Sequence, residues 1–234
     1  MASSSAKITH VIFDLDGLLL DSESIYTRIN EEILSSYGRK YTMKLKTKTA
    51  GMKMDEEINS ILKYEDLTGK VTFEEYKKQY LKLASKYLPD SKLLPGALRL
   101  VKHLAKHLVP IAICTSSNSF EFEIKMQKQE ELLQLINLRV LADDPSVKQA
   151  KPAPDAFLIT MQRFAKKPTS AANVVVFEDS INGVRAAIAA GMQVIMVPDL
   201  HYSKPPEDCK EKILLVLKNL TEFKPETIGL PPFD

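Results

Sequence analysis

The sequence has few cysteines and no long hydrophobic segment. Its two cysteines are far apart, Cys114 in an apolar run and Cys209 in a polar one. This spacing provides neither a zinc site nor a disulfide framework, so we expect a reducing compartment. No segment approaches the length of a membrane span, and residues 1–7 lack the apolar stretch of a signal peptide. We therefore expect a cytoplasmic protein with no membrane partner.

The sequence also lacks an excess of charge of one sign. Its 32 Lys and Arg residues nearly balance 30 Asp and Glu residues, which leaves a formal net charge of +2. No basic run is dense enough to follow a phosphate backbone, so nucleic acid is not an expected partner. With 44% hydrophobic residues, the 234-residue chain can bury a core as one domain, or as one domain with an insertion.

Five short apolar runs, rich in β-branched residues, are the main feature that is present. Their apolarity is continuous and does not alternate, which is typical of strands covered on both faces. Helical patterns lie between the later runs, and this alternation predicts an α/β fold with a Rossmann-like parallel sheet. The predicted strands are residues 10–14, 110–115, 138–142, 173–178 and 192–197. A last amphipathic stretch, residues 210–220, is expected to dock on the core.

A helical insert separates the first two predicted strands by far more residues than one crossover helix needs. Its helical patterns cover residues 22–37, 55–62 and 73–87, and Ser22 is a candidate N-cap for the first of them. We therefore predict a small helical cap inserted into an α/β core. The predicted cap spans residues 21–94, and the core consists of residues 1–20 and 95–234.

The first predicted strand ends in two acidic residues, Asp14 and Asp16, which are followed by Gly17. The carboxyl ends of parallel strands are where α/β sheets hold their active sites. One carboxylate can attack phosphorus, and the other can protonate the leaving oxygen and later take a proton from water. The alternative is an acidic turn that only ends a strand. This motif by itself leaves both interpretations open.

Three further features have the chemistry of a phosphate site. Thr115 and Ser116 end the second strand and offer a hydroxyl and turn amides to phosphate oxygens. Lys151 precedes a helix and can neutralise both a carboxylate and a phosphate. Glu178 and Asp179 end the fourth strand and offer acidic oxygens to a hard cation. Each feature alone is commonly a cap or a surface residue, but together and in this order they predict phosphoryl transfer.

In this order, the four motifs resemble those of the haloacid dehalogenase superfamily, which inserts a small helical cap after the first motif. The resemblance implies a phosphatase in which Asp14 is the nucleophile and Asp16 is the general acid/base. It also implies that the phosphate is bound by Thr115, Ser116 and Lys151.

The same resemblance implies Mg²⁺ as the cofactor. The ion would be held by the Asp14 side chain, the Asp16 main-chain carbonyl and the Asp179 side chain. Glu178 would be either a further ligand or a residue that supports one. The expected partner is then a small-molecule phosphomonoester.

Finer resemblance points to one substrate within this class. Residues 14–23, 141–157 and 220–231 are similar to pseudouridine-5′-phosphatases, which implies pseudouridine 5′-phosphate as the substrate. A polyol- or sugar-phosphate phosphatase is the alternative. A phosphomutase is disfavoured, because mutases of the superfamily typically have His and Arg where this chain has Tyr26 and Met54. A catalytically inactive binding protein is the remaining alternative, and metal-dependent turnover of an aryl phosphate would exclude it.

The remaining polar residues receive structural interpretations. Asp143 and Asp144 are expected in a helix-capping turn and not in a second metal site. Cys114 is expected to be a buried strand residue. We expect a monomer, although the sequence leaves the oligomeric state open. The solvated face of the cap is predicted to carry Lys44, Lys46, Lys48 and Lys53, with contact between Lys53 and the substrate as an alternative.

Overall fold

The structure is a computed structural model that describes residues 7–49 and 51–234. Residues 1–6 and Ala50 lie outside the described residues, so the interpretation of the N-terminal segment as lacking a signal peptide stays a prediction. Within the described ranges, no helix is both long and apolar enough to span a bilayer.

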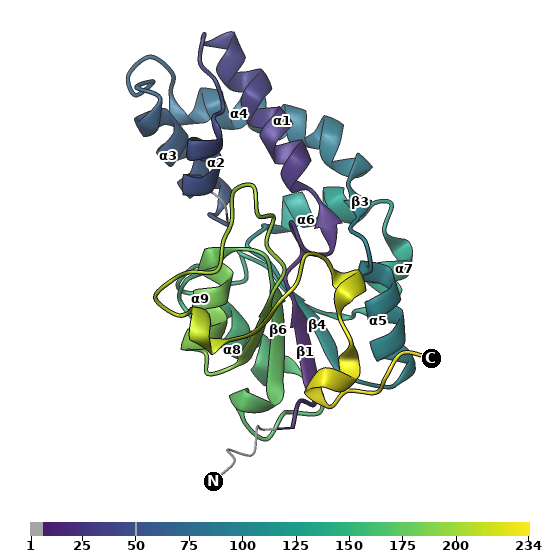
Figure 1. Cartoon of the computed structure of the whole chain (residues 1–234). Helices are drawn as coiled ribbons and strands as arrows, with labels where there is room; N and C mark the ends of the chain where they lie inside the picture. The colour runs from purple at the N-terminus through teal and green to yellow at the C-terminus, as the bar shows by residue number, and fades with distance from the viewer. Residues whose placement is uncertain (1–6, 50) are drawn as a thin grey trace.

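The described residues form a six-stranded parallel sheet in the order β5-β4-β1-β6-β7-β8 (Figure 1). The predicted α/β class with a Rossmann-like sheet is thereby confirmed. β8 falls within the amphipathic stretch predicted at residues 210–220, which docks as an edge strand. The strands are β1 (His10–Phe13), β4 (Ile111–Cys114), β5 (Leu138–Val140), β6 (Val174–Glu178), β7 (Gln193–Met196) and β8 (Ile213–Val216).

Helices cover both faces of this sheet, because its central strands are apolar at every position except His10 and Glu178. β1, β4 and β6 are buried at every position, and a hydrophobic cluster lies on each side. One face packs against α5 (Ala97–Lys106), α6 (Ser119–Met126) and α7 (Glu130–Leu135). The other face packs against α8 (Asp155–Arg163) and α9 (Ile181–Ala189), on the opposite side of the sheet in Figure 1.

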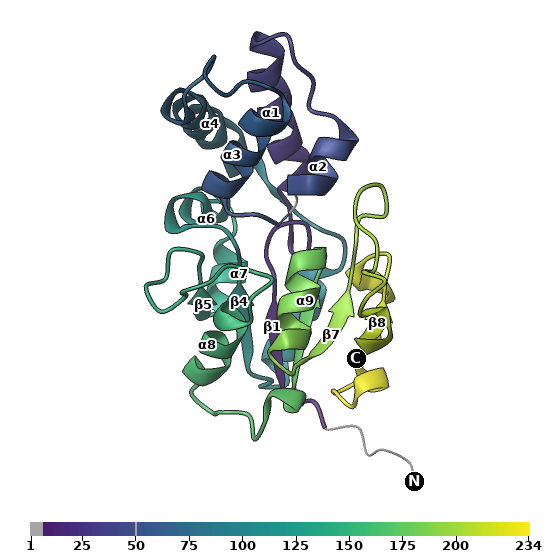
Figure 2. The same cartoon turned by 90° about the vertical axis from the view of Figure 1, so that its left-hand side faces the viewer.

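Four helices among the described residues stand apart from the sheet, at the top of Figures 1 and 2, around a hydrophobic cluster of their own. We call them the cap: α1 (Glu23–Ser36), α2 (Met43–Thr49), α3 (Met54–Tyr64) and α4 (Phe73–Tyr87). Two short antiparallel strands, β2 (Leu20–Asp21) and β3 (Lys92–Leu93), connect the cap with the sheet. The division at residues 21–94 remains a proposal, and this arrangement supports it.

Helix α6 of the core docks against the cap. Ile124 is buried in the cap's hydrophobic cluster, and Tyr80 Oη donates to Glu121 Oε1 at 3.2 Å. Lys53 was predicted on a solvated face of the cap. Its Nζ instead donates to the Ala142 carbonyl oxygen of the core at 3.0 Å. These contacts hold the cap over the carboxyl edge of the sheet.

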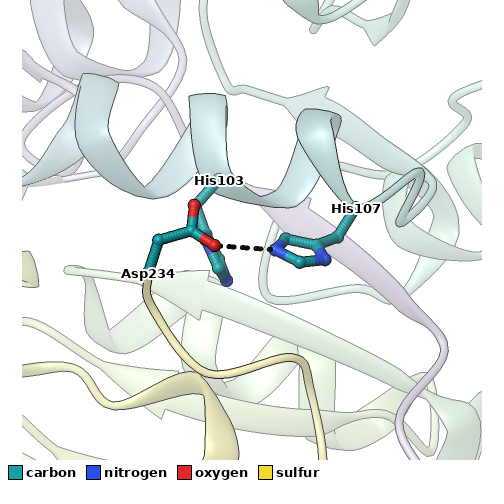
Figure 3. A group of neighbouring side chains, drawn as sticks. All are labelled: His103, His107 and Asp234. Atoms are coloured by element: carbon teal, nitrogen blue, oxygen red, sulfur yellow. Dashed lines mark ion pairs between the residues drawn. The ribbon is translucent and has the colours of Figure 1, made fainter.

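The C-terminal tail is attached to α5 at the far side of the molecule from the cap. His103 Nε2 donates to the Pro231 carbonyl oxygen at 2.8 Å. Asp234 pairs with Lys106 at 2.5 Å. It also lies 3.9 Å from His107, the ion pair marked in Figure 3. The ligand atoms of His103, His107 and Asp234 are close enough to hold a metal ion. Because His103 and Asp234 already have protein partners, we attribute this group to docking of the tail.

Candidate active site

A cavity of about 70 Å³ lies between the cap and the carboxyl edge of the sheet. β1, β4 and β6 are neighbours that end at this edge, so residues far apart in the sequence meet there. All the site residues predicted from the sequence, except Glu178, line the cavity: Asp14, Asp16, Thr115, Ser116, Lys151 and Asp179.

The Lys151 ammonium lies between two buried carboxylates. Its Nζ donates to Asp14 Oδ1 at 2.7 Å and to Glu178 Oε1 at 2.6 Å. It also donates to the Cys114 carbonyl oxygen at 3.1 Å. Burial alone would lower the pKa of Lys151, but the Asp14 and Glu178 carboxylates outweigh it and raise that pKa well above its usual value. Lys151 is therefore a fixed positive charge beside Asp14, where it can bind an anion.

Asp14, Glu178 and Asp179 form an acidic group whose oxygen atoms lie within 4.8 Å of one another. Burial raises the pKa of Asp14 to about 7 against the opposing effect of Lys151, with help from Glu178. Burial, Glu178 and Asp14 together raise the pKa of Asp179 well above its usual value. The Lys151 ammonium alone does not offset the negative charge of these three carboxylates. Carboxylate oxygens are ligands that hard divalent cations prefer. The donor set therefore fits such a cation.

Glu178 is fully buried and both of its oxygens are used by protein donors. Oε1 accepts from Lys151, and Oε2 accepts from the main-chain N–H groups of Asp179 and Ser180, at 3.1 Å each. A Cβ atom at Gly183 would lie 1.8 Å from Glu178 Oε1, so glycine is required where α9 approaches this carboxylate. Of the two roles left open by the sequence, this geometry favours support of Lys151 and Asp179 over direct metal ligation.

The Asp16 carboxylate is held by side chains from three parts of the chain. Ser117 Oγ donates to Oδ2 at 2.7 Å and Thr115 Oγ1 at 3.2 Å. Lys125 Nζ donates to both oxygens, at 2.6 and 2.7 Å. Ser22, predicted as a helix cap, makes no side-chain cap bond and donates to Asp16 Oδ1 instead. Sequence reasoning missed Lys125, although a lone lysine among apolar residues of a helix was a usable signal.

The cap side of the cavity is polar. Lys46 was predicted on a solvated face, but this prediction is wrong, because α2 turns Lys46 toward the core. Lys46 is 9% exposed, and its Nζ donates to Thr27 Oγ1 at 2.8 Å and lies 4.1 Å from the ring centre of Tyr202. The cavity is further lined from the cap by Glu23, Tyr26, Tyr41, Thr49 and Glu57.

The interpretation of Cys114 as a buried strand residue is confirmed. Asp143 accepts from the Ser119 main-chain N–H at 3.1 Å and so adds to the capping of α6, whose N-cap residue is Asn118. Its neighbour Asp144 pairs with Arg163. Cys114 is a buried free cysteine within β4.

We predict that the stability of the protein depends on pH through the buried Glu57 carboxyl group. Burial, with help from Glu23, raises its pKa from 4.5 to about 8. The folded state then binds the proton more tightly than the unfolded chain, so the free energy of unfolding falls as the pH rises from about 4.5 to about 8. Glu57→Gln removes this ionisation and should be more stable than the wild type at about pH 9 but not at about pH 4, by thermal unfolding. The exposed neighbour variant Glu56→Gln should show no such trend, and equal trends would contradict the assignment.

Comparison with known proteins identifies the family. The sequence model of the haloacid dehalogenase-like hydrolases matches residues 11–197. The chain is 40% identical to (DL)-glycerol-3-phosphatase 2 of Arabidopsis thaliana over 100% of this chain and 96% of that protein. It is also 40% identical to a probable pseudouridine-5′-phosphatase of Drosophila melanogaster, over 97% and 96% of the two chains.

A solved structure has the same fold. CbbY from Rhodobacter sphaeroides, in complex with phosphate, superposes with a TM-score of 0.73 at 19% identity. The match covers 92% of this chain and 96% of that one. The chain therefore belongs to the haloacid dehalogenase-like hydrolase family, and within that family it is a phosphoric monoester hydrolase.

Proposed function

We propose that the enzyme hydrolyses a small phosphomonoester through an aspartyl-phosphate intermediate on Asp14. The observation that carries this proposal is the buried Asp14 carboxylate at the wall of the cavity, 2.7 Å from the Lys151 ammonium and with a second acidic residue, Asp16, in the same wall. An Asp14 oxygen forms a bond to phosphorus as the ester oxygen leaves, and Asp16, which enters this step protonated, gives that oxygen its proton. Asp16 then takes a proton from water, which attacks phosphorus and releases phosphate and the free Asp14 carboxylate.

Mg²⁺ is the proposed cofactor, with Asp14, the Asp16 carbonyl and Asp179 as its ligands. The ion would offset the charge between a dianionic phosphate and this acidic group. Thr115, Ser116 and Lys151 would bind the phosphate oxygens.

Rapid quenching of the enzyme with a ³²P-labelled aryl phosphate tests this mechanism. We expect a phosphoprotein that is stable in acid and is cleaved by hydroxylamine. Its label should appear before phosphate release reaches the steady state. Free phosphate released with no protein-bound label at any time would refute the covalent intermediate.

Metal binding gives a separate prediction. Added Mg²⁺ should raise the melting temperature, because a ligand at about 100 times its dissociation constant stabilises the folded state by about 2.7 kcal/mol. The effect should be larger at about pH 8 than at about pH 5.5, because protons compete for acids with raised pKa values. Asp179→Asn should lose most of the rise, while Asp208→Asn, on the surface, should keep it. If Mg²⁺ raised the melting temperature of Asp179→Asn as much as that of the wild type, Asp179 would not be a metal ligand.

For the substrate, two candidates have different support. The sequence resemblance favours pseudouridine 5′-phosphate, and a probable pseudouridine-5′-phosphatase is among the relatives. A polyol phosphate is supported by the cap side of the cavity, where hydroxyl, carboxyl and ammonium groups line the wall. The polar cap residues suit hydroxyl groups, and a glycerol-3-phosphatase is a relative. We therefore propose a small polyol phosphate first and pseudouridine 5′-phosphate as the second candidate.

A substrate panel decides between these candidates. We expect kcat/KM for glycerol 3-phosphate to exceed that for pseudouridine 5′-phosphate by tenfold or more, about 1.4 kcal/mol in transition-state binding. Hexose 6-phosphates and uridine 5′-phosphate complete the panel. A tenfold preference for pseudouridine 5′-phosphate over uridine 5′-phosphate and glycerol 3-phosphate would reverse the order of the two candidates and leave the aspartyl mechanism intact.

A further inference from the structure

Lys125 is the fully buried lysine that the mechanism above does not use. Its side chain is 0% exposed on α6, and its Nζ contacts both Asp16 oxygens at 2.6 and 2.7 Å. The same nitrogen donates to Ser117 Oγ and, at 3.1 Å, to Tyr26 Oη on α1 of the cap. A buried ammonium is stable only when charged and polar partners surround it, and Asp16, Ser117 and Tyr26 are those partners here.

The contacts of Lys125 connect three parts of the molecule that line the cavity: the segment after β1, the segment after β4 and the cap. Asp16 follows β1, Lys125 and Ser117 belong to the segment that follows β4, and Tyr26 belongs to the cap. Asp16 has free rotation about its side-chain bonds, and without partners it would sample several rotamers. With Lys125 on both oxygens, its carboxylate is held in one place at the cavity wall.

We propose that Lys125 is a positioning residue for Asp16. It holds the acid/base carboxylate where the leaving oxygen and the attacking water pass, and through Tyr26 it makes that placement depend on a docked cap. Lys125 acts through Asp16 and takes no part in the bonds that form and break at phosphorus. The inference rests on the proposed function, in which Asp16 transfers the proton.

The rates of the two half-reactions, phosphorylation of Asp14 and hydrolysis of the aspartyl phosphate, distinguish this role from general support of the fold. An alkoxide leaves poorly without a proton, whereas 4-nitrophenolate leaves without one. Misplacing Asp16 should therefore slow phosphorylation of Asp14 by an alkyl phosphate and spare phosphorylation by 4-nitrophenyl phosphate. Hydrolysis of the aspartyl phosphate needs Asp16 as the base, whichever substrate formed the intermediate. The hydrolysis rate should therefore fall by the same factor with the alkyl phosphate and with 4-nitrophenyl phosphate.

The test measures both steps in Lys125→Met by rapid quench. Met is unbranched and close to Lys in length, so it fills the site without the charge. We expect phosphoenzyme formation from glycerol 3-phosphate to slow by about 10²-fold and formation from 4-nitrophenyl phosphate to change by less than about threefold. Lys128→Met, which removes an exposed lysine paired with Asp90, is the matched control and should leave both steps unchanged.

Ser117→Ala is a second variant that keeps the charges in balance, in case Lys125→Met does not fold. It removes one Asp16 contact and one Lys125 contact, and the same substrate-selective slowing is expected at about tenfold. Equal slowing with both substrates, or no slowing with either, would overturn the positioning role. If the wild type forms no phosphoenzyme at all, the proposed function fails, and that outcome is distinct from failure of this inference.

Discussion

Asp14→Asn is expected to abolish turnover while the protein still folds. The amide is a far weaker nucleophile than the carboxylate, and it also removes a charge from the acidic group near Glu178 and Asp179. Loss of a nucleophile that works as a unit with its neighbours commonly lowers kcat by about 10⁴-fold or more. Asparagine has nearly the same shape as aspartate, and Lys151 keeps Glu178 as its ion-pair partner, so the melting temperature should change little.

The measurement is steady-state turnover of 4-nitrophenyl phosphate together with trapping of protein-bound phosphate. Asp14→Asn should give neither product nor label. Asp143→Asn, in the helix-capping turn, is the control and should behave as the wild type. Turnover by Asp14→Asn within about tenfold of the wild type would remove Asp14 as the nucleophile.

Lys151→Met is expected to lower both activity and stability. Lys151 is 3% exposed and pairs with Asp14 and Glu178, which are 8% and 1% exposed. Removing one partner of a buried ion pair commonly costs about 3–5 kcal/mol, because the other charge stays buried without compensation. The same change removes the cation proposed to bind the phosphate, so KM should rise and kcat should fall.

Denaturant unfolding and kinetics on the same preparation separate these two losses. Lys148→Met, three residues earlier and exposed, is the matched control and should keep both stability and activity. Stability should recover partly at low pH, because protonation of Asp14, whose pKa burial already raises, removes the repulsion between Asp14 and Glu178 that the variant leaves behind. Unchanged kcat and KM in a destabilised Lys151→Met would limit Lys151 to a structural role.

The sheet was predictable because its signal is local. A continuous run such as residues 174–177, with Val at three positions and Phe at the fourth, cannot be solvated on either face, so it predicts a strand covered on both sides. The edge strand β8 was recognised only as an amphipathic stretch, since its residues alternate between partly buried and exposed positions. Such alternation fits a strand, but four residues are too few to separate a strand from a short helix.

The cap was harder to predict in detail. Its helices at residues 54–64 and 73–87 have clear apolar faces, but α2 is short and rich in lysine, and no pattern in it indicated that Lys46 faces inward. Lysine stems pack on apolar and aromatic surfaces while their ammonium groups seek polar partners. Whether a lysine does this depends on which surface faces it, and that surface comes from other elements.

The sequence by itself determined the fold class and the set of residues at the edge of the sheet. Parallel strands must end at one edge, so motifs that follow β1, β4 and β6 meet there wherever the chain goes between them. Only the tertiary structure decided how their side chains pair: Lys151 between Asp14 and Glu178, Glu178 turned from the cavity, and Lys125 on Asp16. Two of these contacts span more than a hundred residues of chain, 137 between Lys151 and Asp14 and 109 between Lys125 and Asp16, whereas Lys151 and Glu178 are 27 residues apart. Their geometry depends on the packing of α6, α9 and the cap, for which no short sequence pattern is specific.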